Sequence, residues 1–162
     1  LAVLGDVLAD NESSRLYQLL VKQKQMAVGV SGGAHERRGP SLALFTLHAR
    51  PDQDLAAIEQ ALYGQIKRVK EAPVEDWELR KVRLQFRRQL AQQLQGTLHR
   101  AILLAQHAVF YNNPLHVNAL EAKYEAVTAA DLQRVARKYL TASNRTVVLT
   151  LPKKKEPGAD KK

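Results

Sequence analysis

The chain has 162 residues, of which 45% are hydrophobic and 25% charged, values typical of one globular domain. It contains no cysteine, which excludes disulfides, thiol nucleophiles and cysteine-ligated zinc sites. The formal net charge is +9, and a basic surface attracts nucleic acid, acidic lipid or acidic peptide without identifying any of them. No apolar run reaches the roughly 18 residues of a membrane-spanning helix, and no signal peptide is recognisable.

The first half of the chain predicts two helices followed by a β-hairpin. Apolar residues at helical spacing indicate a helix over 1–8, and the serines at 13–14 are suited to capping a second helix. Alternation of apolar and small residues indicates a strand over 26–30, and residues 42–48 form a second candidate. The link between them contains glycine and proline, so we expect an antiparallel hairpin with a longish loop.

Two amphipathic helices follow the hairpin. Apolar residues at spacings of three and four predict a helix over 52–69. A second apolar stripe continues over 75–109, and it predicts one long helix with acidic residues at its start, where the helix dipole favours them. Gly96 falls within this helix and indicates a bend.

The last part of the chain predicts two shorter helices and a returning strand. A short helix is expected over 117–124, and Thr128 with Asp131 resembles a capping box that starts another helix. The β-branched segment 146–151 predicts a strand, and the lysine-rich residues 152–162 predict a basic tail or linker.

The order of these elements predicts an α+β fold, in which an antiparallel β-sheet is covered by helices. We expect one such domain over residues 1–151. Because the chain begins inside a helical pattern, we also expect it to be a fragment of a longer protein.

Five stretches of the sequence, in this order and spacing, resemble the repeated domain of the pitrilysin/insulinase family of zinc metallopeptidases. They are 13–25, 27–49, the helix start at 51–52, Val74–Leu79, and 127–140 with its Val-Thr-Ala-Ala-Asp-Leu motif, followed by 144–147 and Pro152. The resemblance implies a mitochondrial-processing-peptidase-like metallohydrolase domain. It also implies a first strand before residue 1, which this chain lacks.

The family's zinc chemistry depends on an H-x-x-E-H motif, in which two histidines bind zinc and the glutamate acts on the bound water. The histidines of this chain lie at positions 35, 48, 99, 107 and 116. None belongs to such a motif, and the nearest approach, His35-Glu36, lies in the predicted hairpin loop. We therefore expect no catalytic residue, no metal ligand and no cofactor in this chain, with zinc in the catalytic domain of the parent protein.

The substrate-holding half of this family usually carries Arg and Tyr seven residues apart, and the resemblance places Val21 and Val28 at these positions. Neither side chain can donate a hydrogen bond. The chain is thus expected not to complete the active site, and its substrate-binding residues stay unknown. A free strand edge could still hold an extended peptide through backbone hydrogen bonds.

The resemblance implies a non-catalytic accessory domain, a second or C-terminal domain, which supports the catalytic domain and helps to enclose peptide substrates. Its partners would be an upstream catalytic domain of the same chain or a partner subunit of the same fold, without nucleic acid and without a membrane span. The sequence does not distinguish a periplasmic from a cytoplasmic location in a bacterium.

One alternative is a structural homologue without peptidase activity, of the respiratory-complex core-subunit type. Another is a nucleic-acid-binding module, which would rest on the +9 charge and on a basic helix face formed by Arg80, Lys81, Arg83, Arg87 and Arg88.

Overall fold

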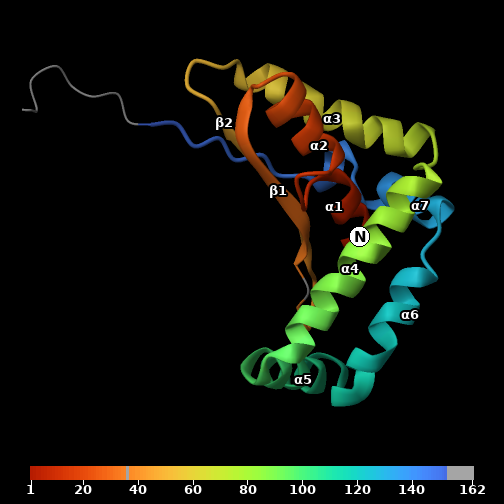
Figure 1. The fold of residues 1–162 in the computed structure, drawn as a ribbon. Coiled ribbons are helices and arrows are strands. Elements are labelled where there is room, and N and C mark those ends of the chain that lie inside the picture. The colour runs from red at the N-terminus through yellow and green to blue at the C-terminus, as the bar shows by residue number, and fades with distance from the viewer. Residues whose placement is uncertain (36, 153–162) are drawn as a thin grey trace, which may run out of the picture.

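The computed structural model describes residues 1–35 and 37–152, so the predicted tail over 152–162 lies, apart from Pro152, outside the described residues. In chain order the elements are α1 (Ala2–Leu8), α2 (Arg15–Tyr17), η1 (Gln18–Gln23), β1 (Ala27–His35), β2 (Leu42–Ala49), α3 (Leu55–Glu71), α4 (Asp76–Gln95), α5 (Thr97–Tyr111), η2 (Pro114–Ala119), α6 (Leu120–Glu125), α7 (Ala129–Tyr139) and η3 (Ala142–Asn144). The predicted α+β class is confirmed, with an antiparallel two-stranded sheet and helices around it (Figure 1). None of the described helices is long and apolar enough to cross a bilayer.

The predicted hairpin is present, and α1 packs against its first strand (Figure 1). β1 pairs with β2 in antiparallel register, with Val30 opposite Leu47. The helix comes unusually close to the strand because two glycines meet there. A Cβ atom on Gly5 would lie only 2.5 Å from the Cα of Gly33.

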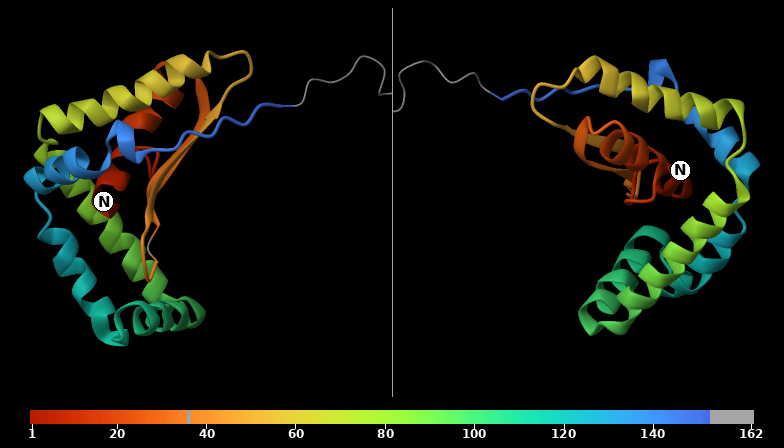
Figure 2. Two further views of the ribbon diagram at one scale, coloured as in Figure 1. Left: turned by 180° about the vertical axis from the view of Figure 1, so that it is seen from behind. Right: turned by 45° about the horizontal axis from the view of Figure 1, so that its top comes forward.

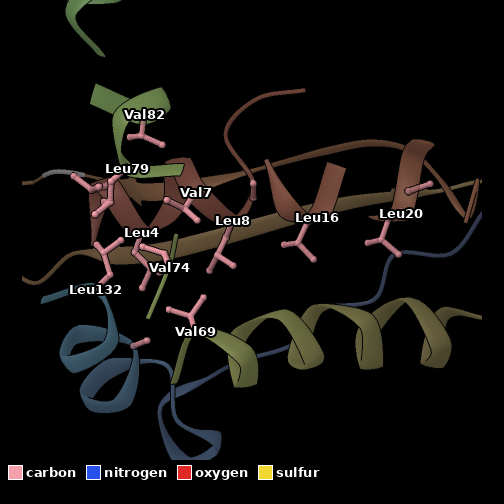
Figure 3. Close-up of a cluster of buried hydrophobic side chains, with 14 of the residues drawn as sticks. Leu4, Val7, Leu8, Leu16, Leu20, Val69, Val74, Leu79, Val82 and Leu132 are labelled. Atoms are coloured by element: carbon pink, nitrogen blue, oxygen red, sulfur yellow. The ribbon is translucent and has the colours of Figure 1, made fainter. Parts of the chain in front are cut away.

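The core lies between the N-terminal segment on one side and α3, α4 and α7 on the other (Figure 3). Its largest fully buried side chains are Leu4, Val7 and Leu8 of α1, Leu16 of α2, Leu20 of η1, Val69 of α3, Val82 of α4 and Leu132 of α7. These residues occupy the apolar positions that the helical spacing predicted. Burial of a leucine of this kind stabilises a fold by about 1.5–3 kcal/mol.

The prediction of one long helix over 75–109 was wrong. α4 ends at Gln95, and Gly96 adopts an extended backbone with φ −82° and ψ 129°, after which α5 starts in a new direction. Glycine in a helix interior is less stable than alanine by about 0.5–1 kcal/mol, which favours a break at this position. α4, α5 and α6 form an arm that leaves the core and returns to α7 (Figure 2).

The predicted capping box is confirmed at the start of α7. The Oγ1 atom of Thr128 accepts a hydrogen bond from the backbone N–H of Asp131 at 3.1 Å. The Oδ2 atom of Asp131 accepts from the backbone N–H of Thr128 at the same distance. These reciprocal bonds satisfy two donors that a helix start otherwise leaves free.

The predicted strand over 146–151 was wrong for the described chain. Residues 145–152 have no regular secondary structure, and Val148 is 81% exposed. β-branched residues form a strand only where another strand offers backbone hydrogen bonds and a surface to pack on. In the part of the chain that the structure describes, β1 and β2 pair only with each other.

Candidate functional site

The histidines do not assemble a zinc site. His35 and His48 are exposed on the hairpin, His99 is exposed on α5, and Glu36 lies outside the described residues. Among residues 1–35 and 37–152, no group of three His, Cys, Asp or Glu side chains could hold a metal ion. A catalytic zinc needs about three protein ligands, so the described residues do not fit one.

One histidine pair does form, and the sequence pattern did not predict it. The Nδ1 atoms of His107 on α5 and His116 on η2 lie 2.9 Å apart, and Lys123 reaches Nε2 of His116. The Asn112–Pro114 turn lies between them, where α5 ends and η2 begins. Its reversal of the chain is the signal that could have indicated the pair.

The two valines at the expected Arg and Tyr positions lie in different environments. Val21 in η1 packs against the core, whereas Val28 in β1 is 59% exposed. Their alkyl side chains have no hydrogen-bond donor for a substrate carbonyl. At these two positions a hydrogen bond to a peptide could come only from the backbone.

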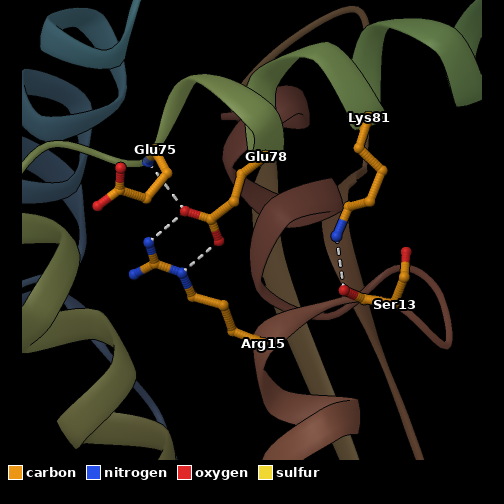
Figure 4. A network of polar contacts seen from close by, with 5 residues as sticks. All are labelled: Ser13, Arg15, Glu75, Glu78 and Lys81. Atoms are coloured by element: carbon orange, nitrogen blue, oxygen red, sulfur yellow. Dashed lines mark hydrogen bonds and ion pairs between the residues drawn. The ribbon is translucent and has the colours of Figure 1, made fainter.

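A buried ion pair fixes the arm to the N-terminal segment (Figure 4). The guanidinium of Arg15 donates to both carboxylate oxygens of Glu78, at 2.7 and 2.6 Å. Glu78 also accepts from the backbone N–H of Glu75, and Lys81 donates to the backbone carbonyl of Ser13 at 2.6 Å. These contacts determine where α4 leaves the core.

Most of the predicted basic helix face is used inside the chain. Arg83 donates to the backbone carbonyl of Val127 at 2.9 Å. Arg87 forms ion pairs with Glu121 at 2.7 Å and Glu125 at 3.1 Å, which join α4 to α6. These cations brace the arm, so the face offers less free charge to nucleic acid than the sequence suggested.

The concave feature that stands out is a groove of about 620 Å³ between the hairpin end, α1 and the arm. Amide side chains from the arm line it, namely Gln85, Gln89, Gln92, Gln93 and Gln106. Aromatic side chains lie beside them, and the rings of Phe86 and Tyr124 stack with centroids 3.6 Å apart. This volume lies within the range of about 300–1,000 Å³ that ligand sites have.

Two carboxyl groups lie at the α1 end of this groove. Burial, and to a smaller degree the neighbouring charge of Asp10, raise the pKa of Asp6 to about 7, while the amino group of Leu1 opposes the shift. Burial also raises the pKa of Asp10. Within the described residues, no lysine or arginine forms an ion pair with either carboxylate. The groove therefore combines hydrogen-bonding amides with two carboxyl groups whose oxygens are not engaged in an ion pair with lysine or arginine.

Comparison with solved structures supports the fold and its relationship to peptidases. The inactive peptidase domain of a Bordetella parapertussis protein is 26% identical, has a TM-score of 0.77, and aligns over 90% of this chain and 78% of its own. A Helicobacter pylori protease is 21% identical with a TM-score of 0.82, over 88% of this chain, which spans only 34% of that protease. The peptidase M16 inactive domain from Pseudomonas fluorescens is 16% identical with a TM-score of 0.68, over 86% of this chain and 34% of its own.

Sequence comparison gives the family. A search of curated proteins returned no match. The family model of the peptidase M16 inactive domain matches residues 1–86, about half of the chain. Peptidase M16 is the pitrilysin/insulinase family that the sequence motifs resemble. The chain belongs to the peptidase M16 family, as an inactive domain of that family.

Proposed function

We propose that this chain is a non-catalytic accessory domain of a zinc metallopeptidase, which supports the catalytic domain and helps to enclose peptide substrates. The observation that carries this proposal is the 620 Å³ groove with its amide lining. Glutamine side chains both donate and accept hydrogen bonds, as the backbone of an extended peptide does. The aromatic rings beside them offer apolar contact for peptide side chains.

The zinc and the catalytic residues belong, in this proposal, to a separate domain or subunit of the same fold that carries H-x-x-E-H. The present chain forms part of the wall around the peptide and contacts it, and it takes no part in the hydrolysis itself. Walls that exclude water and bulky folded proteins favour short or unfolded peptides. Domain organisation follows the same proposal, with residues 1–151 as the accessory domain and 152–162 as a linker or tail.

Peptide binding is tested with the chain alone and a short, fluorescein-labelled, unstructured peptide, followed by fluorescence anisotropy. Replacing Gln89 and Gln93 by alanine removes two hydrogen-bonding groups from the groove, and each neutral hydrogen bond contributes about 0.5–1.5 kcal/mol. We expect the double variant to bind at least about threefold more weakly. Gln95→Ala, on the same helix and outside the groove, should bind like the unchanged protein. No peptide binding, or equal weakening by Gln95→Ala, would count against the groove.

Support of catalysis is tested with a peptidase domain of the same family that carries the zinc motif. Hydrolysis of the same peptide is measured with that domain alone, with this chain alone, and with both. We expect no hydrolysis by this chain and a higher kcat/KM for the pair. An unchanged kcat/KM would favour the structural homologue without peptidase activity.

A further inference from the structure

The α1 end of the groove places two carboxyl groups on the same side of the chain. Asp6 lies on α1, and Asp10 follows it by four residues, which is about one helical turn. The backbone N–H of Asp10 donates to the carbonyl of Gly5 at 3.2 Å and so keeps Asp10 beside the last turn of α1. Both aspartates line the groove.

The amide groups beside these carboxylates donate elsewhere. The Nδ2 atom of Asn11 donates to the backbone carbonyl of Asp6 at 3.3 Å, and the Nε2 atom of Gln85 donates to the Oγ atom of Ser13 at 3.4 Å. The Oε1 atom of Gln85 is buried and accepts no hydrogen bond from the described residues. At this end of the groove, acceptor groups therefore outnumber the donors that the described chain offers them.

The negative charge at this end is not balanced by the described chain. No lysine or arginine of the described chain forms an ion pair with Asp6 or Asp10. Burial first, and the charge of Asp10 second, raise the pKa of Asp6 to about 7, and the amino group of Leu1 offsets this shift only in part. A cation beside the two carboxylates would favour their charged form.

This surplus of acceptors indicates the chemistry of a ligand. The ammonium group of lysine and the guanidinium group of arginine carry hydrogen-bond donors and no acceptor. Their hydrogen bonds to a carboxylate are shorter and stronger than those between neutral groups. A basic side chain thus pairs the free acceptors and balances their charge, whereas an acidic side chain would add to both.

We propose that the α1 end of the groove binds a lysine or arginine side chain of an extended peptide, and that Asp6 and Asp10 determine this specificity. The inference rests on the proposed peptide-binding function of the groove and adds which peptides it prefers. The amide-lined part of the groove contacts the peptide backbone, which is common to every sequence. The two aspartates contact one side chain.

The remaining charges of the chain disfavour basic peptides elsewhere. Arg88 of α4 also lines the groove, and it forms no ion pair within the described chain. It would repel a second basic side chain on the arm side. The net charge of +9 attracts acidic peptides at long range. A preference for basic peptides would therefore have a local origin, and it opposes the order that net charge predicts.

The first test compares three fluorescein-labelled, unstructured peptides that differ at one central residue, which is lysine, norleucine or glutamate. Fluorescence anisotropy with the unchanged chain gives the Kd of each at about 0.15 M salt, where distant charges are largely screened. We expect the lysine peptide to bind at least about fivefold more tightly than the norleucine peptide, and the glutamate peptide to bind most weakly. Tightest binding of the glutamate peptide would overturn the proposal.

The second test removes the two charges and keeps the shape of the side chains. In Asp6→Asn combined with Asp10→Asn, the ratio of the norleucine Kd to the lysine Kd should fall to about one, because the charge-assisted hydrogen bonds are lost. Glu12→Gln combined with Asp52→Asn removes the same charge from exposed positions outside the groove and should keep the ratio of the unchanged chain. An equal fall in both double variants would assign the preference to net charge and overturn the proposal.

The third test reverses one charge. Asp10 is exposed, so Asp10→Lys buries no new charge. This variant should bind the glutamate peptide more tightly than the lysine peptide, because like charges now face each other in the lysine complex. An unchanged preference for lysine would contradict the role of Asp10.

Failure of this inference differs from failure of the proposed function. Equal Kd values for the three peptides would leave the groove as a peptide site and overturn its basic specificity. No binding of any peptide would overturn both. Gln89→Ala combined with Gln93→Ala should weaken all three peptides by a similar factor, because these amides face the peptide backbone in the proposed function. A loss confined to the lysine peptide in this variant would contradict the assignment of specificity to the aspartates.

Discussion

Arg15 on α2 and Glu78 on α4 are 63 residues apart in sequence and are joined by a two-point ion pair that is largely buried. Burial alone would raise the pKa of Glu78, but the hydrogen bonds from Arg15 and from the backbone of Glu75 outweigh it, so the pKa is lowered. A carboxyl group whose pKa is lowered by folding stabilises the fold above its unfolded pKa. This contribution is lost as the pH falls through the folded pKa.

Removal of one partner of this pair should destabilise the fold strongly. Glu78 is only 4% exposed. In Arg15→Met its carboxylate loses the neighbouring cation and two hydrogen bonds. We expect the free energy of unfolding to fall by about 2–4 kcal/mol, because an uncompensated buried charge is costly. Urea denaturation followed by the fluorescence of Trp77, the single tryptophan, measures this change.

Two further variants separate the buried pair from charge in general. Lys67→Met breaks the exposed pair between Lys67 and Glu71, and we expect a loss below about 0.5 kcal/mol. Arg15→Met combined with Glu78→Met removes both buried charges, and it should cost less than Arg15→Met alone. Equal losses in Lys67→Met and Arg15→Met would show that burial of the pair contributes nothing.

The close approach of α1 to β1 predicts opposite outcomes for two glycines in contact. Gly5→Ala places a Cβ atom 2.5 Å from the backbone Cα of Gly33, so helix and strand must separate, and we expect a loss of about 2–4 kcal/mol. A Cβ atom on Gly33 meets no atom within 4 Å. Gly33→Ala should therefore stay within about 0.5 kcal/mol of the unchanged protein. Thermal unfolding of the two variants tests this prediction. Equal melting temperatures would contradict the close approach of Gly5 to Gly33.

The raised pKa of Asp6 predicts a pH-dependent effect. Folding raises the pKa of this carboxyl group to about 7, so the folded chain binds the proton more tightly than the unfolded chain does. Its effect on stability is most favourable below about pH 4 and is lost as the pH rises through 7. Asp6→Asn removes the charge. We expect it to match the unchanged protein near pH 4 and to be more stable by about 1–2 kcal/mol near pH 8.

The matched control for Asp6→Asn is Glu12→Gln, which removes one negative charge from an exposed position in the following loop. Glu12→Gln should leave the difference in the free energy of unfolding between pH 4 and pH 8 as it is in the unchanged protein. Urea denaturation at both pH values provides the measurement. A gain near pH 8 that Glu12→Gln reproduces would be an effect of net charge and not of burial.

Zinc should be dispensable for this chain. After dialysis against metal-free buffer we expect far less than one zinc per chain by elemental analysis. Addition of EDTA should shift the melting temperature by less than about 1 °C, because a structural metal would contribute folding free energy. One tightly held zinc per chain would contradict this prediction, and the His107–His116 pair would be the first place to locate it.

The elements that local sequence determines were predicted well. The hairpin follows from alternation and its glycine- and proline-containing link, and the start of α7 follows from Thr128 and Asp131, whose capping bonds are present. Family motifs identified the inactive M16 domain. Each of these signals acts between residues close in sequence or repeats a known order of motifs, so no knowledge of packing was needed.

Tertiary structure decided the rest, because periodicity shows which residues share a face but not which face meets a neighbour. The apolar stripe of the expected long helix is buried at Val82 and exposed at Leu98, since the chain turns at Gly96 and carries α5 away from the core. The segment 146–151 has the composition of a strand but no strand beside it. The groove exists only because this same turn brings α5 across from the hairpin end.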